Sequence, residues 1–447
     1  MKKIFPVLFI LISILATACG SAAPAPLSAP TAIPTPVANV LYVDPDMELG
    51  EISPYLLGSN LGPWAAVPFN MLDAAYNSNV KAIRFPGGAW GDRNILKPYH
   101  IDPFIDFCKK IGAIPTISVN LRDGTPEQAA ELVRYITIEK EYDVVYWAIG
   151  NEPTLFDKEI GADYDTAHFN TNWRKFAQAM KAVDSNIKLI GPDIHQYAVR
   201  ADARPKDSKG LDWMDEFLKA NGDMIDIATF HRYPFGTNPT KDDLRQNAKE
   251  WDDLVIALRG RIHELTGRDI PIALTEVNTN YNPAVGGDAT PDSHFNAIWL
   301  ADVVGQMAQQ GVFMFNHWML ASSGGAQGGW GMIVRSGLRP SYYTYQMYSM
   351  FGSKLVYSAS GVDNVSIYAA KREDGALTLM VVNLNDDAES VPLQFKGEMP
   401  SSAQLFLFDT EHQAQDMGNI TFPNDGNLSV PGQSVSLYTI IPSQLLP

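Results

Sequence analysis

Two short stretches decide the fold: Tyr146-Trp147-Ala148-Ile149-Gly150-Asn151-Glu152-Pro153 and Pro271-Ile272-Ala273-Leu274-Thr275-Glu276. Each is an apolar run of the kind that a fully buried parallel strand produces, and each ends in a glutamate. A carboxylate inside such a strand is costly unless it has partners. At the carboxyl-terminal end of a barrel strand, by contrast, polar side chains face the active site. We therefore expect Glu152 and Glu276 at the mouth of a barrel.

The chain between residues 54 and 352 repeats this pattern of apolar run and amphipathic helix. One helix start is clear, because Thr125-Pro126-Glu127-Gln128 supplies an N-cap, a proline at the first helical position and a capping-box glutamine. Further helices are expected over Asp165–Asp184 and Asp292–Gln310. Eight strand–helix units favour a (β/α)8 TIM barrel. A doubly wound sheet is the alternative, but no glycine-rich phosphate loop follows the first strand. The predicted strands are Leu56–Leu61, Val80–Phe85, Ala113–Val119, Val144–Ile149, Ile187–Gly191, Ile225–Phe230, Ile270–Thr275 and Val312–Asn316.

Residues 353–447 have a different texture, with short strands separated by turn-rich pieces. This predicts a small antiparallel β-sandwich. The stretch Val40–Ile52 precedes the barrel, and we expect residues 40–53 to add one or two strands to the same sandwich. The predicted strands are Val365–Ala370, Leu377–Asn383, Val391–Phe395, Gln404–Phe408, Leu428–Val430 and Val435–Ile440.

The amino terminus has the features of a targeting signal. Lys2 and Lys3 precede the apolar stretch Ile4–Leu15, which is short for a membrane span. Residues 1–18 are therefore expected to be a signal peptide. The sequence around Cys19 resembles a bacterial lipoprotein box, in which this cysteine is lipidated. Residues 19–39, rich in Pro, Ala, Ser and Thr, would then tether the protein to a cell surface. Plain secretion after cleavage at Ala18 is the alternative.

Charge and cysteine content narrow the function classes. The formal net charge of −16 disfavours nucleic acid or an anionic membrane surface as a partner. Cys108 is the one cysteine besides Cys19, and its helical spacing with Phe104 and Ile111 is typical of a core residue. We find no metal-binding motif, no nucleotide loop and no serine nucleophile elbow, so no metal or cofactor is predicted. The sequence does not indicate whether the protein is a monomer or an oligomer.

Five places along the chain resemble the retaining glycoside hydrolases of clan A. They are Asn151-Glu152-Pro153 after the fourth strand, Glu276 at the end of the seventh, Arg84-Phe85-Pro86-Gly87-Gly88 after the second, His231-Arg232-Tyr233 after the sixth and Trp318 after the eighth. The resemblance covers the chain after residue 40. It lies nearest to the α-L-arabinofuranosidase, β-xylosidase and β-glucuronidase or heparanase-like branches, which also pair a barrel with a β-sandwich.

The resemblance implies that Glu152 is the acid/base and Glu276 the nucleophile of a double displacement. A retaining mechanism needs two carboxyl groups about 5–5.5 Å apart across the scissile bond. A closed barrel would bring the ends of the fourth and seventh strands, and so the two glutamates, to one mouth. Arg84 would hold Glu276 ionised, and Tyr233 would donate a hydrogen bond to it. Asn151 would bind the sugar 2-hydroxyl. The alternative for each glutamate is a helix cap or a surface ion pair.

Further residues are candidates for contact with a carbohydrate substrate. Trp318 would form an aromatic platform for a sugar face, with core packing as the alternative. Gly-rich residues 322–330 are expected to form a loop over the mouth. The other candidates are His231, Asn60, Asn120, Trp90 and Trp330.

The motif Arg84-Phe85-Pro86-Gly87-Gly88 favours an α-L-arabinofuranoside or a related glycan as the substrate. Residues 89–94 depart from the arabinofuranosidase pattern, so an endo-glucanase or xylanase, or a β-glucuronidase, stays open. A catalytically silent glycan-binding lipoprotein is the alternative from another class. Intact glutamates argue against it, since a binder gains nothing from a proton donor and a nucleophile.

Overall fold

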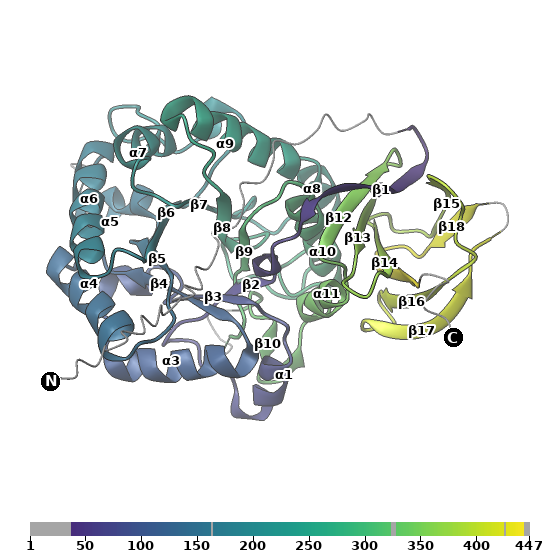
Figure 1. Cartoon of the computed structure of the whole chain (residues 1–447), viewed down its shortest axis with the longest axis horizontal. Helices are drawn as coiled ribbons and strands as arrows, with labels where there is room; N and C mark the ends of the chain where they lie inside the picture. The colour runs from purple at the N-terminus through teal and green to yellow at the C-terminus, as the bar shows by residue number, and fades with distance from the viewer. Residues whose placement is uncertain (1–36, 162–163, 323–327, 424–425, 442–447) are drawn as a thin grey trace, which may run out of the picture.

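The computed structural model describes residues 37–161, 164–322, 328–423 and 426–441. It shows a barrel that carries most of the helices, with a separate sheet at the carboxyl-terminal end of the chain (Figure 1). The expected signal peptide, the lipid site at Cys19 and residues 19–36 of the expected tether lie outside the described residues. Within the described part of the chain, no helix combines the length and the apolar character needed to cross a membrane.

Eight parallel strands close into a barrel, as predicted. Each pairs with its neighbours along the chain, and the first pairs with the last, so the barrel has no free edge. This closure excludes the doubly wound sheet. The barrel strands are β2 (Gly58–Asn60), β3 (Ala82–Phe85), β4 (Ile114–Val119), β5 (Tyr146–Ile149), β6 (Lys188–Ile194), β7 (Ile227–Arg232), β8 (Ile272–Val277) and β9 (Met314–His317).

The helices surround the barrel (Figure 1). The predicted start at Thr125 is present, because its hydroxyl accepts a hydrogen bond from the N–H of Gln128, whose side chain closes the capping box. The α-helices are α1 (Leu72–Tyr76), α2 (Trp90–Arg93), α3 (Pro98–Ile111), α4 (Pro126–Val133), α5 (Asp157–Ile160), α6 (Thr166–Val183), α7 (Trp213–Asn221), α8 (Lys241–Ala248), α9 (Trp251–Thr266), α10 (His294–Gln309) and α11 (Pro340–Ser349). Shorter helical turns are η1 (Pro54–Leu56), η2 (Phe69–Met71), η3 (Arg134–Glu139), η4 (Pro153–Leu155) and η5 (Ala201–Ala203), and β10 (Ile333–Val334) pairs with β11 (Gly337–Leu338).

The remaining strands form one curled sheet in the order β17-β16-β19-β14-β13-β12-β1-β15-β18. Its two ends face each other across an apolar core that includes Val43, Leu379, Leu393 and Val430, which is the predicted sandwich. All neighbours are antiparallel except β1 and β15. The strands are β1 (Leu41–Glu51), β12 (Lys354–Ser360), β13 (Val365–Lys371), β14 (Leu377–Asn383), β15 (Glu389–Phe395), β16 (Ser402–Phe408), β17 (Gln415–Thr421), β18 (Asn427–Val430) and β19 (Ser434–Ile440).

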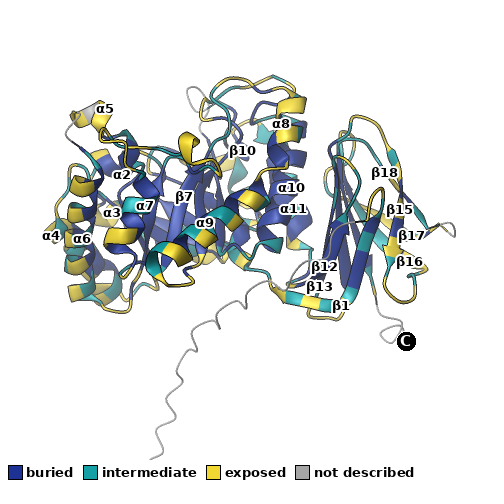
Figure 2. Ribbon diagram, turned by 90° about the horizontal axis from the view of Figure 1, so that it is seen from above, coloured by how far each residue is buried: buried dark blue, intermediate teal, exposed yellow. Residues whose placement is uncertain are grey.

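Helices α10 and α11 lie between the barrel and the sheet (Figure 2). Nearly every residue of α10 is buried, because one side faces the barrel and the other faces the sheet. The hydroxyl of Tyr368 on β13 donates a 2.7 Å hydrogen bond to Asp302 on α10. The sheet therefore shares a core with the barrel wall. Cys108 is also buried, as expected of a core residue, and burial raises its pKa.

Candidate active site

The two predicted glutamates meet at the carboxyl-terminal mouth of the barrel. Glu152 follows β5, and Glu276 is the penultimate residue of β8. One carboxylate oxygen from each, together with a ring nitrogen of His231 on β7, all lie within 4.8 Å of one another. Strands that are far apart in the sequence thus bring three titratable side chains to one point.

Glu276 is held by three hydrogen-bond donors. Its Oε1 accepts from Arg84 Nη1 at 2.8 Å and from the backbone N–H of Gly88 at 3.0 Å. Its Oε2 accepts from the hydroxyl of Tyr233 at 2.9 Å. Arg84 and Tyr233 therefore contact Glu276 as predicted, while the expectation that Arg84 holds Glu276 ionised stays a prediction. The N–H of Gly88 is an additional donor that the sequence analysis treated only as part of a turn.

Glu152 is more open than Glu276. Its side chain is 21% exposed, against 5% for Glu276, and its Oε1 lies 2.9 Å from Nδ1 of His231. His231 is completely buried, and within the described chain its Nε2 has no hydrogen-bond partner. Glu152 is therefore the carboxyl group that can reach solvent, while His231 supports it from below.

Arg84 joins the elements of the site from the barrel centre. It has no exposed surface, and its Nη2 donates to Oδ1 of Asn151 at 2.8 Å. Its Nε and Nη2 also contact Oδ2 of Asp193 at 3.2 and 3.0 Å. Oδ1 of Asn60 lies 3.4 Å from Nη1. One guanidinium thus orients groups from four strands.

The electrostatics of the site couple the two glutamates. Burial raises the pKa of Glu276, and the charge of Glu152 adds to this rise, although His231 and Arg84 oppose it. Burial also acts on Glu152, but the hydrogen bond and charge of His231 outweigh it and lower the pKa of Glu152. Burial lowers the pKa of His231, whereas Glu276 and Glu152 outweigh burial and raise it. The protonation state of each of the three groups therefore depends on that of the other two.

An aromatic wall lines one side of the mouth. Trp318 packs with Tyr233, Trp330 and Trp64 in one small cluster. Its ring centroid lies 6.2 Å from that of Trp330 and 5.6 Å from that of Trp64. Trp330 is fixed by a 2.8 Å hydrogen bond from its Nε1 to the carbonyl of Asn280. Most of the glycine-rich loop predicted over the mouth, residues 323–327, lies outside the described residues.

Asn60 is close to the glutamates but has no exposed surface. Its amide donates to the carbonyl of Thr275 at 3.0 Å and its oxygen faces Arg84. Asn60 therefore contacts Arg84 and, being fully buried, does not match the predicted sugar contact in this structure.

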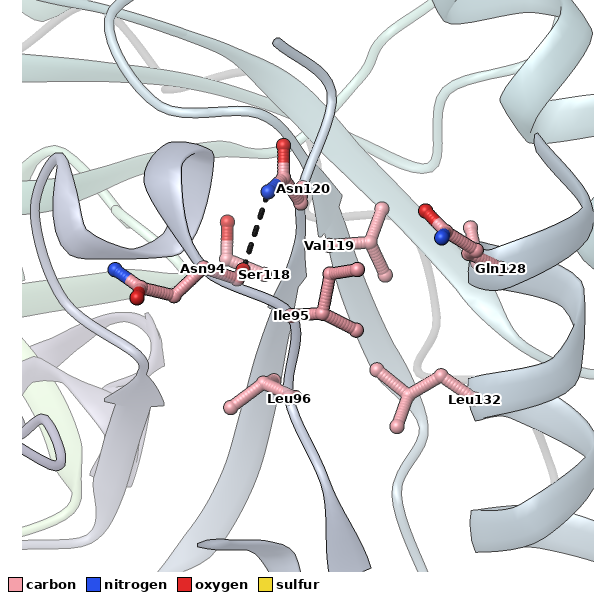
Figure 3. Close-up of a pocket in the computed structure, with 9 residues that line it drawn as sticks. Asn94, Ile95, Leu96, Ser118, Val119, Asn120, Gln128 and Leu132 are labelled. Atoms are coloured by element: carbon pink, nitrogen blue, oxygen red, sulfur yellow. Dashed lines mark hydrogen bonds between the residues drawn. The ribbon is translucent and has the colours of Figure 1, made fainter. Parts of the chain in front are cut away.

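Asn120 lies at the end of β4 beside a small cavity between this strand and α4 (Figure 3). Its Nδ2 donates to the carbonyl of Asn94 at 3.1 Å, and its Oδ1 accepts from the N–H of Asp123 at 2.9 Å. Among the described contacts none joins Asn120 to either glutamate. Its predicted sugar contact therefore stays a prediction. The residues lining the cavity are Asn94, Ile95, Leu96, Ser118, Val119, Asn120, Gln128, Ala129 and Leu132.

Trp90 begins α2 and packs edge-on against His100 at 5.4 Å between ring centroids. It is half-buried, and no contact given by the described residues links it to the two glutamates. Its predicted role as a sugar contact also stays a prediction.

The sequence analysis missed Asp193, His195 and Trp64. Asp193 and His195 lie at the carboxyl-terminal end of β6, and His195 Nδ1 lies 2.6 Å from the hydroxyl of Thr154 in the turn that follows Glu152. Their position just after the fifth predicted strand was a signal, because polar residues at that end of a barrel strand face the site, but nothing in the local sequence marked Asp193 as a buried partner of Arg84. Trp64 lies in the loop after β2, a place without a distinguishing motif.

The cluster of Glu152, His231 and Glu276 offers three possible metal ligands. The donor set fits a cation poorly, because Arg84 already contacts Glu276 as a positive charge. Gly88 and Tyr233 also donate to the oxygens that a metal would need. We therefore read the cluster as an acid–base site.

The sequence is similar to those of known carbohydrate-active enzymes. Heparanase from Rattus norvegicus is 25% identical over 311 residues, which cover 64% of this chain and 54% of the heparanase. Alpha-L-arabinofuranosidase C from Emericella nidulans is 26% identical over 162 residues, covering 27% of this chain and 31% of that enzyme. No family model matches the sequence. The chain spans about half the length of the heparanases it matches.

Solved structures extend the likeness across both parts of the fold. An alpha-L-arabinofuranosidase from Thermotoga maritima has a TM-score of 0.70 and 19% identity, covering 90% of this chain and 99% of that one. CelM2, a bifunctional glucanase-xylanase from a metagenome library, has a TM-score of 0.69 and 16% identity, covering 91% and 99%. The chain is therefore similar in sequence and in fold to glycoside hydrolases of clan A. The names of these similar proteins point to different glycans, so the likeness alone leaves the substrate open.

Proposed function

We propose that this protein is a retaining glycoside hydrolase that acts through a covalent glycosyl-enzyme. The observation that carries the proposal is the distance of at most 4.8 Å between oxygens of Glu152 and Glu276. Retaining enzymes keep their carboxyl groups about 5–5.5 Å apart, whereas inverting enzymes need about 6.5–9.5 Å to admit a water molecule between them. With one oxygen of each carboxyl group within 4.8 Å of the other, the spacing is nearer to the retaining range than to the inverting range.

In the first step, a carboxylate oxygen of Glu276 attacks the anomeric carbon while the bond to the leaving oxygen breaks. Glu152 gives its proton to that oxygen, so the aglycon leaves as an alcohol. In the second step, Glu152 takes a proton from water, the water oxygen attacks the same carbon, and the bond to Glu276 breaks. The sugar is released with its original anomeric configuration, and both carboxyl groups return to their first state.

The hydrogen bonds around each glutamate suit these roles. The pKa directions in the free site run the other way, lowered for Glu152 and raised for Glu276, so Glu152 must gain a proton before the first step. Arg84, Gly88 and Tyr233 hold both oxygens of Glu276, so the nucleophile is fixed in one orientation before the substrate arrives. Glu152 has fewer partners and more exposed surface, which suits a group that exchanges protons with a leaving group and with water. Arg84 holds the side-chain oxygen of Asn151 beside Glu152. This leaves the amide nitrogen of Asn151 to bind the sugar 2-hydroxyl.

The best-supported substrate is an α-L-arabinofuranoside or a similar neutral glycoside. The longer match to heparanase makes a uronide the second candidate. A uronate, however, needs a cation with free donors, and Arg84 already donates to Glu276, Asn151 and Asp193. This engagement favours a neutral sugar next to Glu276. An endo-acting glucanase or xylanase is the third candidate.

The test is hydrolysis of a panel of aryl glycosides and polysaccharides by the wild-type protein and by Glu276→Ala. Release of arabinose, lost in Glu276→Ala, supports the proposal as stated. Release of glucuronate would move the substrate to the second candidate, and products from polymers alone would indicate endo action. Glycan binding that is retained without turnover would contradict the enzyme and favour a silent binding protein.

We also propose that the protein works outside the cytoplasm of a bacterium, anchored by a lipid on Cys19, with plain secretion as the alternative. The resemblance of residues 16–20 to a lipoprotein box supports this placement. Metabolic labelling with a radioactive fatty acid tests it. Label in the wild type and none in Cys19→Ser is the expected result, and an unlabelled, medium-secreted wild type would contradict the anchor.

A further inference from the structure

Asp193 is a buried carboxylate that contacts Arg84 and Thr275 beside Glu276, and the backbone of Glu152. Its Oδ2 accepts from Nη2 and Nε of Arg84, and its Oδ1 accepts a 2.6 Å hydrogen bond from the hydroxyl of Thr275. Its backbone carbonyl accepts from the N–H of Glu152 at 2.9 Å. Because Asp193 is only 1% exposed, it does not meet a substrate directly.

The local backbone explains why this side chain points into the barrel. Asp193 has a φ of +52°, and the pairing of β6 with β7 shifts register between Pro192 and Ile194. Asp193 is therefore the extra residue of a bulge, a feature that often re-aims a side chain next to an active site. Its N–H donates to the hydroxyl of Thr229 at 3.0 Å, which anchors the bulge to the neighbouring strand.

The charges around Asp193 do not cancel. Asp193 and Glu276 both form ion pairs with Arg84, at 3.0 and 2.8 Å, so two negative charges share one positive charge. Burial raises the pKa of Asp193, but the charge of Arg84 and further contacts outweigh it and lower the pKa, so Asp193 stays ionised. The surplus negative charge favours a proton on the neighbouring groups.

The charged groups around Asp193 come from several elements. Arg84 on β3 and His231 on β7 act on Asp193 directly. Glu276 on β8, Glu152 after β5 and Asp92 on α2 act on the same Arg84 guanidinium. His195 lies two residues further along the chain, just after the end of β6.

We propose that Asp193 is a positioning residue. It holds the Arg84 guanidinium in an orientation in which Arg84 pairs with both Asp193 and Glu276, and its negative charge keeps a proton on the Glu152–His231 pair. The inference rests on the proposed glycosidase function. Asp193 orients Arg84 so that Nη1 faces Glu276 and Nη2 faces Asn151. Through Thr275 and the N–H of Glu152 it also sets the distance between the two strand ends.

The main test is Asp193→Asn, which removes the charge and keeps the shape. Loss of a negative charge favours the ionised carboxyl groups, so the whole pH–activity profile moves to lower pH, by about one pH unit. The kcat falls about tenfold or more because Arg84 loses its orientation, while KM stays within about threefold. The matched control is Asp215→Asn, since Asp215 forms a two-point ion pair with Arg261 on the barrel exterior. The control leaves both the profile and kcat unchanged.

A second pair of variants tests the positioning without changing charge. Thr275→Val removes the 2.6 Å hydrogen bond to Asp193, and Thr275→Ser keeps it. A lower kcat in the valine variant, restored in the serine variant, supports the inference. This pair decides the matter if Asp193→Asn does not fold, and equal kcat in both variants would then overturn it.

NMR titration of the His231 imidazole gives a readout that needs no turnover. Asp193→Asn lowers the pKa of His231, because a neighbouring negative charge is gone. If the wild-type protein hydrolyses no glycoside, the proposed function fails, yet this titration still tests Asp193. A folded Asp193→Asn variant with an unchanged His231 titration and an unchanged pH–activity profile would overturn the inference.

Discussion

Nδ1 of His231 lies 2.9 Å from Oε1 of Glu152 and is the one side-chain hydrogen-bond partner of that carboxylate within the described chain. The same nitrogen lies 3.7 Å from Oε2 of Glu276. The imidazole therefore stands between the two carboxyl groups, and its charge lowers the pKa of each against the effect of burial.

Replacing His231 by asparagine keeps a donor but removes the charge. Both carboxyl groups then hold their protons to higher pH, so the pH–activity profile of His231→Asn moves upward, in the direction opposite to Asp193→Asn. Initial rates across pH measure this. His294→Asn is the control, since His294 bonds to Gln433 in the sheet. An unmoved profile would mean that His231 carries no charge in the working enzyme.

The acid/base role of Glu152 predicts a substrate-dependent loss. Glu152→Ala lowers kcat by about 10²–10⁴-fold for glycosides with poor leaving groups, because their departure needs a proton. For activated aryl glycosides the rate of the first step falls much less, because their leaving groups depart without a proton. Added azide restores turnover by replacing the water that Glu152 would activate, and it forms a glycosyl azide of retained configuration. Glu264→Ala, on the outside of α9, shows none of this. An equal loss for all leaving groups, without azide rescue, would contradict the assignment.

Gly88 combines a hydrogen bond to Glu276 with a steric limit. Its φ is +68°, its N–H donates to Glu276, and a Cβ at this position would lie 2.7 Å from the ring of Trp318. Gly112 has a φ of +69° with no atom within 4 Å of the same point. Each change to alanine costs about 1 kcal/mol of stability from backbone strain.

Only Gly88→Ala should lower kcat/KM and change the tryptophan fluorescence of the native protein, because only it displaces Trp318. Thermal unfolding and steady-state kinetics of both variants compare the two effects. Full activity in Gly88→Ala would show that the N–H contact and the Trp318 position do not matter for turnover.

His317 predicts how stability depends on pH. Burial lowers the pKa of His317 to about 3. In the unfolded chain the imidazole takes up a proton below about pH 6.5, whereas the folded protein leaves it neutral. This group therefore supports the fold above pH 6.5, and its contribution falls by about 1.4 kcal/mol per pH unit as the pH drops toward 3.

Denaturant unfolding of wild type and His317→Asn between pH 7 and pH 4 measures this contribution. The difference in unfolding free energy between the two proteins narrows with falling pH. Only the wild type has the His317 imidazole, so only the wild type loses stability through its protonation in the unfolded chain. The exposed His263 provides the control variant, His263→Asn. A difference that stays constant over this range would show that His317 takes up its proton as readily in the folded protein as in the unfolded chain.

The barrel was predictable because its strands are apolar runs that end in polar residues. Each of the eight predicted runs overlaps an observed strand, and the capping box at Thr125 begins α4. In the sheet, β12 and β17 were missed. β17 is an edge strand with almost every residue exposed, so Gln415–Thr421 shows no buried face in the sequence. Edge strands of this kind lack the period-two signal on which strand prediction depends.

The site divides in the same way. Glu152, Glu276, Arg84 and Tyr233 end strands within recognisable motifs, and the structure brings them together. Asp193 follows a Gly-Pro pair and reads as loop, because its role depends on a bulge and on partners more than 80 residues away along the chain. Which way an amide such as that of Asn60 points also depends on neighbouring strands. Such details are set by tertiary packing and not by local pattern.

The most direct test is the anomeric configuration of the first product, followed by ¹H NMR during hydrolysis of whichever aryl glycoside the wild-type protein cleaves. Carboxyl oxygens of Glu152 and Glu276 within 4.8 Å of each other predict that the first-formed sugar keeps the configuration of the substrate, before mutarotation mixes the anomers. Release of the opposite anomer first would contradict the double displacement at Glu276.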